Sequence, residues 1–332
     1  MSAHSVDPVL QGELAYEALR LAFIPWQRER RIAKERERIR LARLSSRVIA
    51  GGYAHSLALR RDGGIACWGD NGFDFLENDV GQAPPDGING DFVATAAGFH
   101  HSLAVRRDGR IACWGDNSYD QAPPGGVDGD FVMVAAGTNH SLALRRDGSV
   151  ACWGDNGEGQ APPDGVDGDF VAIAAGAAYS LALRRDGNVA CWGDNNQGQA
   201  PPDGVDGDFV AIAAGGAHSL SLRRDGRIAC WGFNGNGQAP PGGVDGDFVA
   251  IAAGNYHSIA LRRDGRIACW GSNNDGKALP DGVDGDFVAI AASGRHSLAL
   301  RRDGSIACWG SNNEGQAPPA GVLGPFGLNV DV

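Results

Sequence analysis

The tripeptide Cys-Trp-Gly occurs seven times in the chain, and no other feature limits the possible folds as strongly. The seven copies begin at Cys67, Cys113, Cys152, Cys191, Cys230, Cys269 and Cys308, so the first interval is 46 residues and the other five are 39. A tandem repeat of this length indicates a unit of secondary structure that packs against copies of itself. The fold must therefore be built from seven equivalent units.

One repeat, residues 170–208, contains three segments that favour β-strands. FVAIAA is a run of small and branched apolar residues, SLALR alternates, and NVACW ends in an aromatic residue. Their period is two rather than the 3.6 of a helix. Asp186-Gly187 predicts a tight hairpin, because glycine adopts the positive φ that such a turn requires. Gly176 opens a second turn, and the Gly-, Asn-, Asp- and Pro-rich stretch after Trp192 predicts a crossing loop.

The second strand of this repeat has a large and a small face. Leu181 and Leu183 point to one side, whereas Ser180 and Ala182 point to the other. A three-stranded unit of this shape cannot bury both faces alone, but seven wedges around an axis can. We therefore predict an all-β fold, a seven-bladed β-propeller of three-stranded, 39-residue blades, with an N-terminal α-helical extension. Its turns explain why 51 of the 332 residues are glycine.

The repeated residues also resemble a known family. Ala-Gly-x-x-His-Ser-Leu-Ala-Leu-Arg-x-Asp-Gly followed by Trp-Gly-x-Asn-x-x-Gly-Gln is similar to the regulator of chromosome condensation repeat, from about Arg47 to Pro319. The compact three-stranded form is closer to the beta-lactamase-inhibitor protein branch of that superfamily. The resemblance implies a propeller. It also implies two possible activities: nucleotide exchange on a small GTPase, or substrate recognition as in propeller-containing ubiquitin ligases.

Residues present in every repeat are interpreted as structural. The tryptophans are expected to anchor blade packing; they are Trp68, Trp114, Trp153, Trp192, Trp231, Trp270 and Trp309. The seven cysteines form no Cys-x-x-Cys pair, so we expect neither a disulfide framework nor a zinc site, but buried reduced thiols. Fourteen arginines in the hairpins and the Asp-rich loops should meet on one rim as surface ion pairs.

The His-Ser pair recurs in six repeats, and Tyr179 replaces the histidine in the fourth. Adjacent strand residues point to opposite faces, so the two residues of one pair cannot act as nucleophile and base. We expect hydrogen bonding within the turn, with a ring of metal-binding histidines as a weaker alternative. The Asp-Gly-Val-Asp-Gly-Asp loops lack calcium-loop spacing, and turn chemistry accounts for them.

Function is expected where the repeats differ. The two residues between Gly and His-Ser vary most, and they should lie on the face opposite the Asp-Gly hairpins. Contiguous blades there carry aromatic residues beside an arginine, which is the composition of a protein-binding hot spot. The partner-binding residues predicted in these turns are Tyr53, Phe99, His100, Tyr256 and Arg295.

The 46-residue interval contains an insertion of seven residues, which falls within residues 73–80. Phe73, Phe75 and Leu76 are three large apolar residues among acidic ones, and we expect them to add to the same partner-binding surface. Exchange factors of the resembled family use an inserted element on a small GTPase, which makes this loop the candidate for such a contact.

The first 47 residues differ from the rest in charge. They hold ten Lys or Arg against six Asp or Glu, whereas the remainder holds 19 against 34. We predict a basic helical extension over residues 1–46, broken at Pro25, then the propeller over 47–322 and a tail over 323–332. The extension could dock on the acidic propeller, bind an anionic partner or stay solvated.

These patterns predict a non-enzymatic protein-interaction scaffold, with a guanine-nucleotide exchange factor or a ubiquitin-ligase recognition part as alternatives. We expect no catalytic residue, no metal and no cofactor. We also expect no membrane partner, and the acidic propeller disfavours direct contact with nucleic acid. The partner should be a protein, with a small GTPase as one candidate. No secretory signal is visible, so a cytoplasmic or nuclear location is expected.

Overall fold

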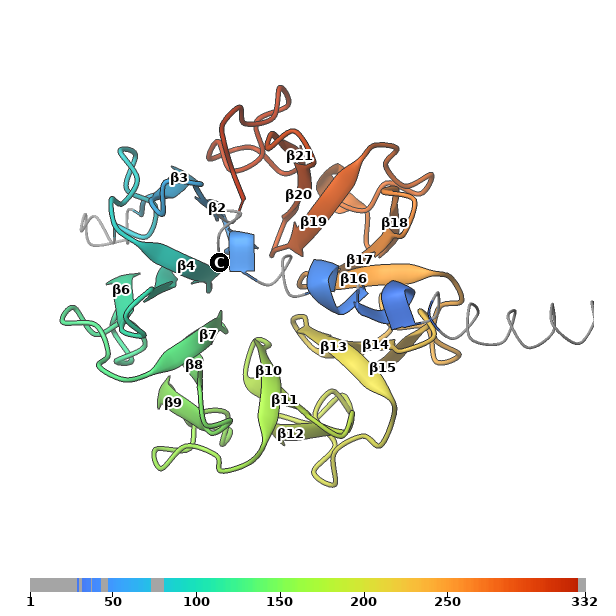
Figure 1. Cartoon of the computed structure of the whole chain (residues 1–332), viewed down its shortest axis with the longest axis horizontal. Helices are drawn as coiled ribbons and strands as arrows, with labels where there is room; N and C mark the ends of the chain where they lie inside the picture. Colours follow the sequence, from blue (N-terminus) through green and yellow to red (C-terminus); the bar gives the residue numbers. More distant parts are fainter. Residues whose placement is uncertain (1–28, 30–31, 37, 43–46, 73–80, 328–332) are drawn as a thin grey trace, which may run out of the picture.

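The computed structural model describes residue 29 and residues 32–36, 38–42, 47–72 and 81–327. Seven three-stranded antiparallel sheets stand around a central axis, each with its strands in sequence order (Figure 1). The predicted seven-bladed propeller is therefore confirmed. The first strands all line an apolar cavity of about 210 Å³ on the axis.

The blades repeat the same strand lengths. The first strands are Ile49–Gly51 (β1), Phe92–Ala97 (β4), Phe131–Ala136 (β7), Phe170–Ala175 (β10), Phe209–Ala214 (β13), Phe248–Ala253 (β16) and Phe287–Ala292 (β19). The second strands are His55–Leu59 (β2), His101–Arg106 (β5), His140–Arg145 (β8), Tyr179–Arg184 (β11), His218–Arg223 (β14), His257–Arg262 (β17) and His296–Arg301 (β20). The third strands are Ile65–Gly69 (β3), Ile111–Gly115 (β6), Val150–Gly154 (β9), Val189–Gly193 (β12), Ile228–Gly232 (β15), Ile267–Gly271 (β18) and Ile306–Gly310 (β21). One 3₁₀ turn, Asn274–Gly276 (η1), follows β18.

The Asp-Gly turns form the hairpins that the sequence predicts. Between β11 and β12, Gly187 has φ +99°, and its N–H donates to the carbonyl of Arg184 at 3.1 Å. The Asp186 carboxylate accepts from the Asn188 N–H at 2.9 Å. We call the side of the ring that carries the seven Arg-Arg-Asp-Gly turns the hairpin face. The opposite side is the turn face; it carries residues 53–54, 99–100, 138–139, 177–178, 216–217, 255–256 and 294–295.

The second strands are buried, and each joins two cores. Leu181 and Leu183 of β11 pack with Phe209 of the next blade, whereas Ala182 packs with Leu142 of the preceding blade. Small side chains on one blade therefore receive large side chains from its neighbour. The apolar core is consequently divided among the interfaces between blades, as expected for wedges around an axis.

The chain closes the ring with its C-terminal segment. Phe326 pairs with Arg60 beyond the end of β2 and is 4% exposed in the core of the first blade. The Arg61 N–H donates to the carbonyl of Pro325 at 2.9 Å. Phe326 thus takes the place that Phe92 holds in the second blade. The predicted end of the propeller at residue 322 leaves Phe326 in the tail, although Phe326 packs in the core of the first blade.

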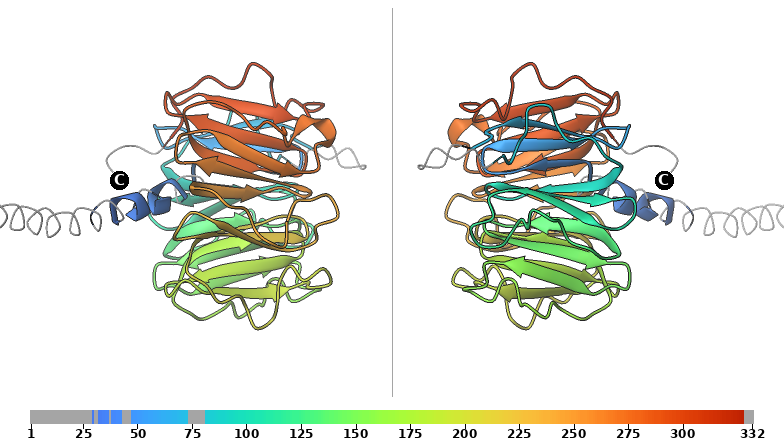
Figure 2. Two further views of the ribbon diagram at one scale, coloured as in Figure 1. Left: turned by 90° about the vertical axis from the view of Figure 1, so that its right-hand side faces the viewer. Right: turned by 90° about the vertical axis from the view of Figure 1, so that its left-hand side faces the viewer.

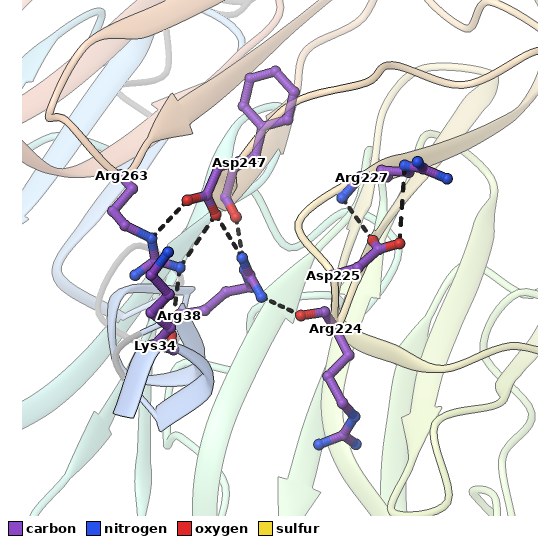
Figure 3. Close-up of polar contacts among 8 residues, drawn as sticks. Lys34, Arg38, Arg224, Asp225, Arg227, Asp247 and Arg263 are labelled. Carbon is purple, nitrogen blue, oxygen red and sulfur yellow. Dashed lines mark hydrogen bonds and ion pairs between the residues drawn. The ribbon is translucent and has the colours of Figure 1, made fainter. Parts of the chain in front are cut away.

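The described part of the basic extension lies on the hairpin face. Residues 32–36 and 38–42 are helical and lie over β13 and β16 (Figures 1 and 2). Arg38 donates to the carbonyl of Phe248 at 2.8 Å, to an Asp247 carboxylate oxygen at 2.7 Å and to the carbonyl of Arg224 (Figure 3). Of the alternatives for the extension, this segment is docked on the propeller. The expected helix break at Pro25 lies outside the described residues.

Candidate functional site

The repeated His-Ser pairs form hydrogen bonds between blades. The His101 Nε2–H donates to Ser141 Oγ of the next blade at 3.0 Å, and that hydroxyl donates to the carbonyl of Gln121 at 2.9 Å. Five other histidines make the same contact, and the last of them, His296, closes the ring onto Ser56. We expected these side chains to form hydrogen bonds within their own turns. That prediction was wrong, because the partner of His101 lies 40 residues away along the chain, in the next blade.

Tyr179 occupies the position of these histidines in the fourth blade, but it makes different hydrogen bonds. Its hydroxyl accepts from Ser219 Oγ at 3.2 Å and donates to the carbonyl of His218. The network therefore stays continuous where histidine is absent. In the described part of the chain, no group of three or more His, Cys, Asp or Glu side chains could hold a metal ion.

Burial keeps the repeated histidines neutral. Desolvation and the nearby His296 and His101 rings lower the pKa of His55 to about 3. Burial lowers the pKa of His218 to about 4. Burial also raises the pKa of Cys67 to about 12, and all seven cysteines are free. A thiol with such a pKa is not a reactive nucleophile at neutral pH.

The repeated tryptophans hold the crossing loops in place. The Trp153 indole N–H donates to the carbonyl of Gln121 at 2.9 Å, the same carbonyl that accepts from Ser141. All seven indoles make the equivalent contact. Each blade is thereby tied to the loop that enters it.

The hairpin face carries the ion pairs that the sequence predicts. Arg107, for example, contacts Asp91 at 2.9 Å, and equivalent pairs recur in the following five blades. In most of these pairs both side chains are exposed, so each ion pair contributes little to stability. The first arginine of the motif instead lies over the ring of the first strand, as Arg106 does over Phe92 at 4.8 Å.

The turn face brings four of the predicted residues together. The rings of Tyr53 and Phe99 stack with centroids 4.1 Å apart, and His100 meets Phe99 edge-on at 4.5 Å. The Arg295 guanidinium lies over the Tyr53 ring at 5.3 Å. These four side chains, which we call the aromatic stack, come from blades seven, one and two. They are contiguous only because the ring is closed.

The other predicted partner-binding residues lie elsewhere. Tyr256 is 52% exposed and lines, together with Tyr53 and Arg295 of the stack, an adjoining hollow of about 520 Å³ on the turn face. Phe73, Phe75 and Leu76 lie outside the described residues.

The turn face is divided by charge. A half-buried aspartate follows the third strand in the first four blades, at Asp70, Asp116, Asp155 and Asp194. Phe233, Ser272 and Ser311 replace it in the last three. The acidic side of the face therefore adjoins a side that lacks these carboxylates and carries Arg295.

One residue of the hollow was not among the predicted ones. Lys277 replaces the glutamine that stands at the equivalent position of the six other repeats. Its side chain is only 5% exposed. The substitution is visible in an alignment of the repeats, so the same search for differences that found Arg295 could have found it.

Part of the acidic side surrounds His100. Burial lowers the pKa of His100 below the ordinary value, although the charges of Asp70 and Asp116 act in the opposite direction. The aromatic stack is therefore uncharged at neutral pH except at Arg295. It offers a flat apolar surface with a cation at one end.

No described helix is long and apolar enough to cross a membrane.

A search of curated proteins finds no match. Among solved structures, the CRINKLY WD40 ectodomain of the Arabidopsis thaliana receptor kinase ACR4 is 24% identical, with a TM-score of 0.64 over 83% of this chain and 98% of that one. Prp20p from Saccharomyces cerevisiae is 19% identical, with a TM-score of 0.59 over 86% and 87%. A structure of Kap60 bound to yeast RCC1 (Prp20) contains a chain that is 22% identical, with a TM-score of 0.57 over 71% and 74%.

The family comparison agrees with the repeats. The model of the regulator of chromosome condensation (RCC1) repeat matches seven times, over residues 47–74, 92–121, 131–160, 170–199, 209–238, 248–277 and 287–316. These matches cover more than half of the chain and coincide with the seven blades. The chain therefore belongs to the RCC1 repeat family.

Proposed function

We propose that this protein is a non-enzymatic interaction scaffold that binds another protein on its turn face. The observation that carries the proposal is the aromatic stack, in which Arg295, Tyr53, Phe99 and His100 form one continuous set of contacts. Stacked aromatic rings beside an arginine are typical of the residues that dominate protein interfaces. None of the four is required by the repeat, because other blades carry different residues at these positions.

The repeated network supports a role without covalent catalysis. The described histidines of the repeats are buried and neutral, and the thiols have raised pKa values. The chemistry-bearing side chains of the repeat therefore serve the packing of the blades. Seven free cysteines also support work in a reducing compartment, the cytoplasm or the nucleus.

Structures of similar proteins support a protein partner. One is described as Kap60 bound to yeast RCC1, and another reports the binding of Prp20p to Gsp1p and histones. By analogy, nucleotide exchange on a small GTPase is the alternative activity, and it is tested by nucleotide release from a panel of small GTPases. Acceleration by this chain would establish that alternative, and no acceleration with any GTPase would remove it.

Affinity capture with the whole chain tests the scaffold. The double variant Tyr53→Ala with Phe99→Ala carries at both sites the residue that blade four has at Ala177, so we expect it to fold. Arg110→Ala on the hairpin face is the control. We expect the wild type and the control to recover the same proteins and the double variant to lose them. An unchanged set of proteins with the double variant would contradict the proposal.

A further inference from the structure

The hollow beside the aromatic stack contains a lysine that the repeat does not explain. In the seventh blade, Gln316 accepts from the N–H of Glu314 at 2.9 Å and donates to Ser311 Oγ at 3.4 Å. The glutamines of other loops accept in the same way. Lys277 stands in the equivalent position but has no acceptor atom in its side chain. It therefore cannot close its loop as the glutamines do.

The loop around Lys277 differs from the others accordingly. Residues Asn274–Gly276 form a 3₁₀ turn, and Asp275 adopts φ +67°. Only two non-glycine residues among those described have a positive φ, and Asp275 is one of them. Its carboxylate lies 4.0 Å from the Lys277 ammonium. Backbone strain of this kind is found at functional sites more often than elsewhere.

The hollow brings Lys277 together with a second cation from another blade. It is lined by Lys277 and Asp275 from one loop, by Arg295 and Tyr256 from two turns and by Tyr53 from the first blade. Two cations and one carboxylate leave a single positive charge in a protein of net charge −11. Ser272 stands in the same wall, where four other blades carry an aspartate.

The Lys277 ammonium is incompletely neutralised where it lies. Burial lowers its pKa below the ordinary value, and Arg295 adds to this, whereas Asp275 acts in the opposite direction. Its ion pair with Asp275 is long, and Asp275 is itself about half exposed. An anion that entered the hollow would therefore be attracted by two cations from different blades.

We propose that Lys277 and Arg295 form a binding site for a carboxylate, supplied by an acidic side chain of the protein partner. The inference rests on the proposed function, since the site adjoins the aromatic stack and shares Arg295 and Tyr53 with it. One carboxylate matches the single net positive charge of the hollow. A phosphate dianion would exceed it and would be repelled more strongly by the acidic propeller.

NMR titration of the whole chain tests the site. The Trp309 indole N–H is a built-in reporter, because it donates to the carbonyl of Lys277 at 3.0 Å. The probes are acetylated, amidated tri-glutamate, the matched tri-glutamine and inorganic phosphate. We expect tri-glutamate to shift the Trp309 indole signal and the Arg295 amide signal saturably. Tri-glutamine should bind at least tenfold more weakly.

The variants separate the site from the fold. Lys277→Gln restores the residue of the other repeats, and we expect it to weaken tri-glutamate binding about ten- to a hundredfold, the range for losing a hydrogen bond to a charged group. Arg110→Gln removes an exposed charge from the hairpin face and should bind like the wild type. No saturable shift, equal binding by Lys277→Gln, or tighter binding of phosphate than of tri-glutamate would overturn the proposal.

The same variant distinguishes this inference from the scaffold function. If Lys277→Gln recovers the partners of the wild type in full while the Tyr53 and Phe99 double variant loses them, the scaffold stands and the carboxylate site is wrong. If both lose the partners and tri-glutamate binding is lost as well, both proposals are supported.

Discussion

Replacing Lys277 by glutamine should make the protein more stable. Glutamine would regain the hydrogen bond from the backbone N–H of residue 275, which is 2.9 Å long at the equivalent Gln316. One such bond contributes about 1 kcal/mol to the free energy of unfolding. Release of Asp275 from its positive φ would add about 1 kcal/mol. We therefore expect Lys277→Gln to raise the free energy of unfolding by about 1–2 kcal/mol.

The gain in the free energy of unfolding from Lys277→Gln depends on pH. The pKa of Lys277 is lower in the folded protein than in the unfolded chain, so the folded state is penalised while the lysine is protonated. The penalty is fully present below the folded pKa and disappears as the pH rises through the ordinary lysine value of about 10.4. The advantage of Lys277→Gln should thus be largest at neutral pH and decrease under alkaline conditions.

Thermal and urea unfolding, followed by circular dichroism, measure the effect. Gln316→Lys makes the reverse exchange in the next blade and serves as the matched variant, which we expect to be less stable than the wild type. A Lys277→Gln variant with equal or lower stability at neutral pH would refute the reasoning. It would mean that the lysine does not strain its loop.

Three further predictions concern the ring and its cover. Phe326→Ala should lower the free energy of unfolding by about 3–5 kcal/mol, the usual cost for a buried phenylalanine, in urea titration; a loss under about 1 kcal/mol would show that Phe326 does not close the ring. Stability should fall from pH 6.5 downward, by roughly 1.4 kcal/mol per buried histidine for each pH unit, because histidines such as His101 have a pKa of about 3 when folded and 6.5 when unfolded. Urea midpoints that stay constant from pH 8 to 5 would contradict this. Arg38→Ala should expose residues 32–36 and 38–42 to trypsin and lower the free energy of unfolding by about 2–3 kcal/mol, while Arg110→Ala, at an exposed site, should change neither. Equal proteolysis of the two variants would disprove the docking contact.

The sequence alone was sufficient to predict the blade. Gly187 had to adopt a positive φ, and the alternation of Leu181 and Ala182 required two different neighbours. Both signals are local, and both act identically in every copy. The same reasoning failed for the His-Ser contact, since no local pattern says that His101 bonds to a serine 40 residues away.

The closing residue was missed for a different reason. Gly324-Pro325-Phe326 repeats the Gly-Asp-Phe that opens the other blades, with proline in place of aspartate. The remaining C-terminal residues do not continue the FVAIAA pattern, so the three residues do not stand out as part of a repeat. Only the closed ring shows that the first blade combines β1 with Phe326, which pairs with Arg60 from the C-terminal part of the chain.

The repeated network explains why few buried positions differ between the repeats. Each histidine, serine, glutamine and tryptophan of the repeat takes part in a contact between blades, so a change there disturbs a neighbour as well as its own blade. The turns that carry the aromatic stack lie outside this network, so their side chains can change without this effect. Lys277 is a different case, because it replaces a residue of the loop network itself. Its side chain gives up the glutamine contacts, whereas its carbonyl still accepts from Ser297 and Trp309. The blade interface therefore survives the substitution, and the cost remains within one loop, which is the condition under which a repeat can acquire a binding residue.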